Sequence, residues 1–440
     1  MSTEMLAVYM FIFSLLAIIM GVHVAFALAG SAVIFGLIGL GPSIFELYVI
    51  STFDVLTTYS LIAVGLFIFM GSLLESSGIT ERLYKVLHIA LGSFKGGLAV
   101  TTIIICIFFG ACTGVIGASI VTMALIALPG MLSKGFNKAL AAGTVMAGGC
   151  LGMIIPPSIM LILYGSIAGT SIPKLFAAGI FPGVILGMMY VAFIGILCIV
   201  KPEWGPTITK EERAAYSFTM VGKTLLTGFL PVMTLIFLVL GSIFAGICAP
   251  TEAAGIGGLG GIILCALYRK LKFEVIKRAC IMTVRTVAMV LFIVLGAKYF
   301  IATFTSLGGG EIAENLLSPF IGRPGLLMLV LVAILFILGM FMDWIGLVYV
   351  FVPILNPIIA GMGLDPVWYG MIFCLTLCVS LMTPPFAYAV FYLKGVAPPE
   401  MTIMDMYKGC LPFLVFQILI IVLIYIFPGL VTWLPSVWIG

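Results

Sequence analysis

Charged side chains are scarce in this sequence. Lys and Arg contribute 20 and Asp and Glu 16 of 440 residues, which is 8%, whereas 63% of the residues are hydrophobic. Soluble domains carry about a quarter charged residues. A water-soluble fold is therefore excluded, and the lipid bilayer is the solvent that suits this surface. The net charge of +4 is explained by a basic cytoplasmic rim, so no nucleic acid is expected as a partner.

Signatures of catalysis are also missing. The two histidines, His23 and His88, have no metal-ligand spacing, and the motifs HExxH, GxSxG and GxxxxGK[ST] do not occur. These absences argue against an enzyme and against an ATP-driven pump. Most of the ten cysteines lie inside apolar runs, where they are typical of small buried side chains. We expect no disulfide framework, no cofactor and a retained first helix in place of a cleaved leader.

Long apolar segments dominate what is present. Residues 226–248 contain no charge, and a helix needs about 20 apolar residues to cross the hydrocarbon. The pattern predicts an all-α membrane protein with about ten to twelve membrane segments. The other candidate segments are 5–22, 24–40, 60–74, 139–164, 175–200, 254–268, 286–303, 326–342, 368–393 and 411–435.

The charges predict an orientation. Segment 269–285 holds six basic residues and one acid, and segment 201–223 is also basic, so we expect both to be cytoplasmic loops. Segment 304–325 holds two acids and one basic residue, and should be periplasmic. Segments 78–96 and 43–59 are amphipathic, and we interpret them as helices lying at the membrane interface or as loop helices.

An internal repeat relates the two halves. LFIFMG at 66–71 returns as LFIVLG at 291–296, and GIFPG at 179–183 matches GCLPF at 409–413. GMIIPPS and SLMTPPF carry matching Pro-Pro pairs. The offsets run from 225 to 230, so the order is kept with small gaps. Matched repeats with interrupted membrane segments are typical of secondary transporters.

The interrupted segments predict two re-entrant helical hairpins. GACTGVIGAS (110–119) and GMFMDWIGL (339–347) place several glycines inside apolar stretches, and Pro129 and Pro353 follow as expected return points. Unpaired backbone groups at such tips are tolerated only where they line a cavity or bind an ion.

The Pro-Pro pairs predict two unwound helices. Pro156-Pro157 and Pro384-Pro385 remove backbone donors and free carbonyl groups one turn earlier. These carbonyls can coordinate Na⁺, and helix N-termini facing the gap favour an anion. The simpler alternative is two kinked helices with a packing role.

Ionisable residues within apolar segments are candidates for function. Asp343 is the strongest, because it lies in the second predicted hairpin. Glu252 is either a supporting acid or a cap of the helix that it begins. Glu75 is expected to close a helix at an interface. Lys298 and Lys394 are expected near helix ends, where they would snorkel.

At these residues the sequence resembles the large (M-type) membrane subunit of tripartite ATP-independent periplasmic (TRAP) transporters. The resemblance rests on LFIFMGSLLESSGI, GACTGVIGASIVTMALIALPGML, GMIIPPSIMLILYG, APTEAAG and SLMTPPFAYAVFYLKG. It implies a sodium-driven elevator transporter with two inverted repeats in the bacterial inner membrane. It also implies two separate partners, a small four-helix membrane subunit and a periplasmic substrate-binding protein.

The resemblance also implies a set of sodium- and substrate-binding positions. They are Thr113, Gly114, Gly117 and Ser119 in the first hairpin; Pro156, Pro157 and Ser158 in the first unwound helix; and Asp343, Gly346, Thr383, Pro384 and Pro385 in the second repeat. The TGVIGAS tip departs from the serine-rich tip of many relatives, which favours backbone carbonyl ligands there. This variant and the PEWGP loop resemble the subgroup associated with 2-oxo acids.

The expected organisation has four parts. Residues 1–59 form N-terminal scaffold helices, 60–200 the first repeat, 201–285 a cytoplasmic loop with connecting scaffold helices, and 286–440 the second repeat with a C-terminal helix. The predicted function is sodium-driven uptake of a small organic anion. A stand-alone sodium-coupled anion symporter is the nearest alternative, followed by an intramembrane enzyme and a channel.

Overall fold

The computed structural model describes residues 2–113, 116–207 and 218–439, and within these residues every regular element is a helix. The first half contains α1 (Thr3–Ile19), α2 (Val24–Leu40), α3 (Ile44–Leu56), α4 (Ser60–Ser76), α5 (Ile79–Leu91), α6 (Gly97–Thr113), α7 (Ile116–Ser133), α8 (Lys138–Leu151), α9 (Ile159–Ala168) and α10 (Ile172–Val200). Short 3₁₀ turns, Gly41–Ser43 and Pro202–Trp204, complete it.

The second half repeats this order. It contains α12 (Phe218–Phe244), α13 (Pro250–Leu267), α14 (Phe273–Ser306), α15 (Gly309–Ile321), α16 (Pro324–Gly339), α17 (Trp344–Gly361), α18 (Pro366–Met382), α19 (Tyr388–Lys394), α20 (Ile403–Ile426) and α21 (Gly429–Trp438). Helices α4 to α10 correspond to α14 to α20, and both α5 and α15 follow a left-handed glycine, Gly78 or Gly308. The repeat predicted from sequence is therefore present in the order of the helices.

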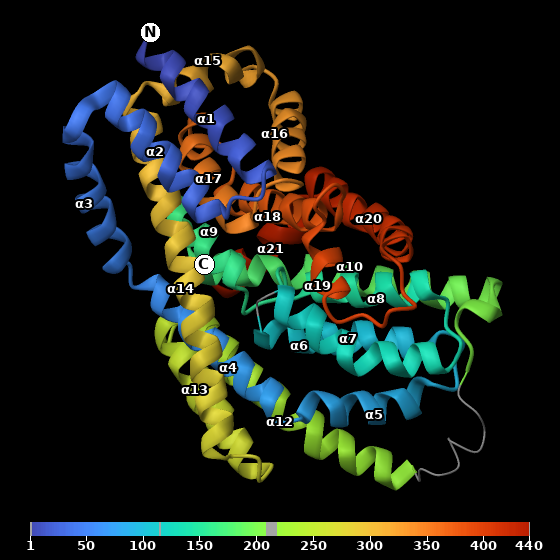
Figure 1. Cartoon of the computed structure of the whole chain (residues 1–440). Coiled ribbons are helices and arrows are strands. Elements are labelled where there is room, and N and C mark those ends of the chain that lie inside the picture. Colours follow the sequence, from blue (N-terminus) through green and yellow to red (C-terminus); the bar gives the residue numbers. More distant parts are fainter. Residues whose placement is uncertain (1, 114–115, 208–217, 440) are drawn as a thin grey trace.

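The two halves exchange helices. Helix α2 packs along α14 of the second half, and α13 packs along α4 of the first half (Figure 1). These contacts are close: a Cβ on Gly296 of α14 would overlap the backbone carbonyl of Ala25 in α2, and one on Gly257 of α13 would lie 2.7 Å from Sδ of Met70 in α4. Each half therefore completes its packing with a helix of the other.

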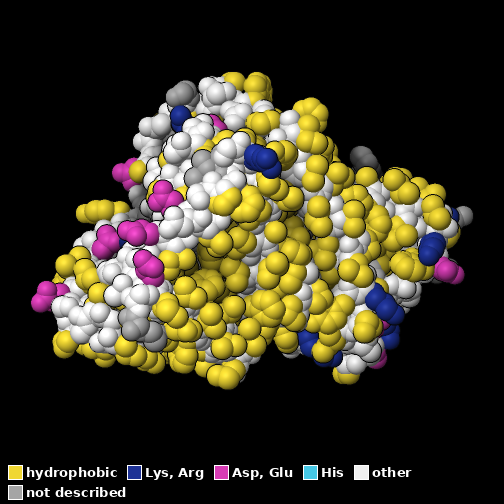
Figure 2. Space-filling model, turned by 90° about the horizontal axis from the view of Figure 1, so that it is seen from above, with side chains coloured by type: hydrophobic (Ala, Val, Ile, Leu, Met, Phe, Trp, Pro, Cys, Tyr) yellow, Lys and Arg dark blue, Asp and Glu magenta, His cyan; other side chains and the backbone are white. Residues whose placement is uncertain are grey.

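The surface suits a bilayer. In the described residues eight helices are long and apolar enough to cross a membrane, or up to nine if the bent pair α4–α5 forms one span. Hydrophobic side chains cover most of the face in Figure 2, while acidic side chains gather at its left end and several Lys and Arg at its lower right. Six further apolar helices have only 10–17 residues, and several of the ten to twelve segments predicted from sequence fall on them.

Three local predictions were wrong. Most of the basic segment 269–285 is helical, because α14 begins at Phe273 and no glycine or proline interrupts its first third. Pro129 and Pro353 lie inside α7 and α17, so the chain turns before these helices and not at the prolines. Lys298 lies eight residues before the end of α14, where its ammonium group pairs with the Asp54 carboxylate of α3 at 2.5 Å.

Candidate functional site

The first proline break, at Pro156-Pro157, is closed, in the sense that it is buried inside the protein. Helix α8 ends at Leu151 and α9 begins at Ile159, and every residue between them is buried. Ser158 is 0% exposed; its hydroxyl donates to the carbonyl of Met153 and accepts from the backbone N–H of Leu161 at 3.3 Å. The break predicted at Pro156-Pro157 is confirmed, and its one hydroxyl is engaged in capping α9.

The second proline break, at Pro384-Pro385, is open, in the sense that it reaches the surface of the protein. Helix α18 ends at Met382 and α19 begins at Tyr388, while Pro384 and Pro385 are exposed. The half-buried Thr383 donates from its hydroxyl to the carbonyl of Val379 at 2.8 Å. Ala387 has φ +44°, a left-handed conformation that costs free energy for an alanine and is common at ligand-binding sites.

The first hairpin consists of α6 and α7, which pack together. A Cβ on Gly110 of α6 would overlap the Cα of Gly152, which follows α8, so the hairpin rests on the first break by backbone contact. Ser119 is buried in α7. Thr113 ends α6, and Gly114 lies outside the residues that the structure describes, so the predicted role of this tip stays a prediction.

The second pair, α16 and α17, carries the matching contact. A Cβ on Gly339 of α16 would overlap the hydroxyl of Ser380 in α18. These residues stand at the positions of Gly110 and Gly152 in the first half. Between the helices, Asp343 caps α17 by accepting the backbone N–H of Ile345 at 3.0 Å. Gly346 lies against Val24 of α2.

The two halves meet around α19. Helix α19 packs on α7 of the first hairpin, and α9 packs on α17 of the second. A Cβ on Gly117 would lie 2.9 Å from Cε1 of Tyr392, which is 37% exposed. Asp343 ends the α16–α17 connection, and Phe341 of the same connection lies 6.2 Å from Phe386 of the open break, measured between ring centroids. Each hairpin thus brings a residue to the open break or to the helix that follows it.

Aromatic rings line the open break. The ring of Phe386 lies 6.2 Å from that of Phe341 in the α16–α17 connection, and 6.5 Å from those of Tyr388 and Phe391. Sequence reasoning missed these side chains, because an aromatic residue in an apolar segment looks the same whether it packs in a core or borders a cavity.

A polar contact between α4 and α7 was also missed. The hydroxyl of Thr122 donates to Oε1 of Glu75 at 2.5 Å, both groups being partly buried. Glu75 does lie near the end of α4, as expected, but it also connects this helix to the first hairpin.

Glu252, by contrast, is exposed and accepts the backbone N–H of Ala249 at 2.8 Å. It caps α13, a helix that packs on α4 and α12, so its place favours the capping interpretation.

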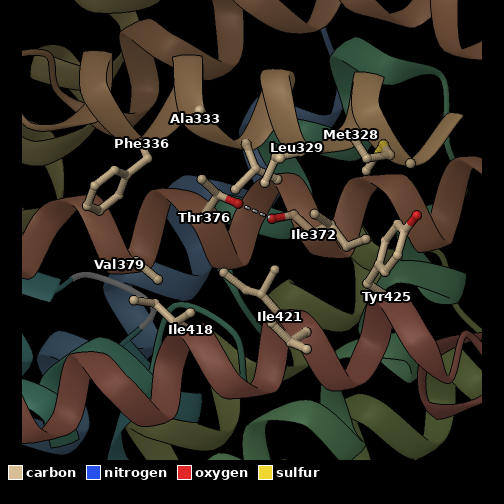
Figure 3. A pocket seen from close by; sticks show the side chains of 13 residues that line it. Met328, Leu329, Ala333, Phe336, Ile372, Thr376, Val379, Ile418, Ile421 and Tyr425 are labelled. Carbon is tan, nitrogen blue, oxygen red and sulfur yellow. Dashed lines mark hydrogen bonds between the residues drawn. The ribbon is translucent and has the colours of Figure 1, made fainter. Parts of the chain in front are cut away.

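An apolar groove of about 480 Å³ lies apart from these breaks, between α16, α18 and α20 (Figure 3). The hydroxyl of Thr376 points along its own helix and donates to the carbonyl of Ile372 at 2.8 Å. The remaining lining has no charged side chain and is apolar apart from the hydroxyl of Tyr425; it includes Phe336 and Ile421. This groove lacks groups that could hold a charged solute.

The region around α19 has groups for ions of both signs. Asp343 supplies a carboxylate. The backbone at residues 340–343 and 383–387 lies between helices, so carbonyl groups there are not all used in helical hydrogen bonds. Oxygen ligands of this kind suit a hard cation such as Na⁺. The N-terminal ends of α7 and α19 begin nearby, and helix N-termini attract anions.

Comparisons with known proteins agree with this architecture. A family model described as "Tripartite ATP-independent periplasmic transporter, DctM component" matches residues 9–430. The chain is 28% identical over 396 residues to the C4-dicarboxylate TRAP transporter large permease protein DctM of Pseudomonas aeruginosa, covering 89% of each chain. It is 28% identical over 448 residues to the 2,3-diketo-L-gulonate TRAP transporter large permease protein YiaN of Escherichia coli, covering 99% and 100%.

A solved structure shares the fold. The YdaH transporter of Alcanivorax borkumensis superposes with a TM-score of 0.59 at 16% identity, covering 92% of this chain and 90% of that one. The match supports the helical architecture without bearing on the solute.

Proposed function

Because this chain belongs to the DctM family of tripartite ATP-independent periplasmic transporters and is an integral protein of the bacterial inner membrane, we propose that it carries a small organic anion into the cell, driven by sodium. The observation that carries this proposal is that both hairpins reach the open Pro384-Pro385 break: Gly117 lies against Tyr392 of α19, and the ring of Phe341 lies 6.2 Å from that of Phe386. Cation and anion would bind next to each other there, so that each favours the binding of the other.

The names of relatives indicate the class of solute. Permeases similar to this chain are named for C4-dicarboxylate, 2,3-diketo-L-gulonate, sialic acid and isethionate. All four are organic acids that are anionic at neutral pH. We therefore propose that the solute of this chain is a small carboxylate or a related acid, and 2-oxo acids are the first class to test.

The mechanism proposed is an elevator. Hairpins α6–α7 and α16–α17, with the broken helices α8–α9 and α18–α19, would move as one body against a scaffold built on α2, α4, α13 and α14. The close backbone contacts at Gly110 and Gly339 support treating each hairpin and its broken helix as one unit. The exchange of α2 and α13 supports a scaffold shared by both halves.

Two partners complete the proposal. A separate small membrane subunit would pack on the scaffold, and a periplasmic binding protein would deliver the anion. The proposal is carried by family membership, because the permeases matched are named as TRAP transporter proteins. A stand-alone symporter remains the second candidate, since both hairpins and both proline breaks belong to this one chain.

Reconstitution tests the proposal. The chain and its small subunit are placed in proteoliposomes with an inward sodium gradient, and uptake of radiolabelled pyruvate, succinate and sialic acid is measured with and without the binding protein. Uptake that needs both sodium and the binding protein is expected. Uptake without the binding protein would favour the stand-alone symporter, and uptake that ignores the sodium gradient would contradict the proposed coupling.

A further inference from the structure

The start of α14 forms a basic cavity away from the solute site. A cavity of about 740 Å³ lies between the first third of α14 and the end of α4. Three cations line it, Lys277, Arg278 and Arg285, together with one acid, Glu274. Hydroxyls are supplied by Ser76 and Thr286. The lining therefore has an excess of positive charge and several hydrogen-bond donors.

The three cations are available to a ligand. Lys277, Arg278 and Arg285 are exposed, and none of them forms an ion pair or hydrogen bond with a protein side chain among the residues that the structure describes. Arg278 and Arg285 are seven residues apart, which is about two helical turns and about 10 Å along one face of α14. Their long side chains can approach an anion placed between them, and arginine binds phosphate oxygens in pairs.

Exposed apolar side chains share this face. Ile281 and Met282 line the same cavity and are 43% and 38% exposed, and Val284 beside them is 66% exposed. A soluble anion would leave these side chains in water. A ligand with a charged head and a hydrocarbon tail would instead cover the cations and the apolar groups together.

The length of α14 places the cavity at the membrane surface. The helix has 34 residues, about 51 Å at 1.5 Å per residue, whereas the hydrocarbon core is about 30 Å thick. Residues 286–306 are long enough to cross that core, so residues 273–285 extend into the headgroup region. Figure 1 shows this start of α14 at one end of the molecule, beside α13 and α4.

We propose that this cavity binds the headgroup of an anionic phospholipid from the cytoplasmic leaflet, with Lys277, Arg278 and Arg285 holding the phosphate and Ile281 and Met282 contacting the acyl chains. Basic segments beside membrane helices favour the cytoplasmic side and its anionic lipids. This lipid site goes beyond the proposed transport function, because it is independent of which solute is carried. It would anchor the scaffold pair α4–α14 to the bilayer.

Native mass spectrometry of the purified, delipidated full chain tests the proposal. Phosphatidylglycerol is titrated against wild type, R278Q/R285Q and K270Q/K272Q. The last variant removes two cations from the same segment that do not line the cavity. We expect the apparent Kd of R278Q/R285Q to rise at least about tenfold, since the charge-assisted hydrogen bonds from both arginines to the phosphate are lost. K270Q/K272Q should stay within about twofold of wild type, because neither lysine lines the cavity.

Three results would overturn the assignment. Equal weakening in the two double variants would show a diffuse charge effect with no site. Phosphatidylcholine binding as tight as phosphatidylglycerol would exclude recognition of an anionic headgroup. Retention of inorganic phosphate that is lost in R278Q/R285Q, with no lipid retained, would assign the cavity to a soluble anion. Size-exclusion profiles of all variants control for misfolding, which exposed Arg→Gln changes should not cause.

Discussion

The two proline breaks occupy matching positions but differ in their surroundings. Around Pro156-Pro157 every residue is buried and the hydroxyl of Ser158 is engaged on both sides, whereas Pro384 and Pro385 are exposed and are followed by aromatic residues. The same motif therefore serves a packed core in one half and an accessible surface in the other. An approximate repeat can duplicate a backbone interruption and still give the two copies different access to solutes.

Cysteine labelling tests most directly whether the two proline breaks differ in accessibility, and the effect should be the largest of those expected here. In a background without native cysteines, S158C and T383C place a thiol at each break with little change in size. We expect a membrane-impermeant thiol reagent to modify T383C and to leave S158C unmodified, because Ser158 is 0% exposed and Thr383 is partly exposed. Equal labelling at the two positions would contradict the difference, and denatured samples of both variants control for intrinsic reactivity.

Neutralising Asp343 should have the next largest effect. In D343N the carboxylate beside the open break is lost while the side chain keeps its size, so we expect uptake to fall by about tenfold or more, equivalent to about 1.4 kcal/mol of binding. The sodium concentration for half-maximal uptake should rise. E252Q is the matched control, because that acid is exposed and caps α13; uptake by D343N at the level of E252Q would remove Asp343 from the site.

Overpacking the hairpin contact should cost stability. G110A adds a Cβ that overlaps the backbone at Gly152, which cannot move aside without shifting α8. We expect a loss of about 1–3 kcal/mol, seen as a lower thermal unfolding midpoint in detergent. G195A in α10 meets nothing within 4 Å and should be neutral; a midpoint for G110A equal to that of G195A would show that the hairpin does not rest on the break.

The contact between Glu75 and Thr122 gives a smaller test. At the offset of 229 that relates Gly110 to Gly339, Thr122 of α7 corresponds to Phe351 of α17, which has no hydroxyl, so this hydrogen bond has no counterpart in the second half. T122V leaves a partly buried carboxylate without its partner and should destabilise the chain by about 1–2 kcal/mol. The double variant E75L/T122V should recover part of that loss, because both polar groups are removed together. Recovery is checked by the same unfolding assay, and additive losses would argue against a direct interaction.

Much of the fold could be predicted from sequence. The breaks at Pro156-Pro157 and Pro384-Pro385 follow from the missing amide of proline, and glycines such as Gly110 and Gly339 mark the hairpins because close helix packing needs small residues. The ends of helices were harder to predict where a helix continues into a polar segment, as at the start of α14.

The site was less predictable than the fold. The proximity of Gly117 to Tyr392 joins residues that are far apart in the chain, and no local pattern encodes it. The exposure of one break and the burial of the other depend on which helices cover them. Sequence reasoning therefore named candidate residues but could not tell which of them lie together, and their roles in binding stay predictions.

The exchange of α2 and α13 has a consequence for how the chain is made. Helix α2 leaves the ribosome long before α14, its packing partner, is synthesised, and α4 likewise waits for α13. Contacts so distant in sequence form late and slowly. The first half should therefore enter the bilayer with α2 and α4 not yet packed against their partners. A chain truncated after α10 would be a candidate for degradation and not an independently stable half-transporter.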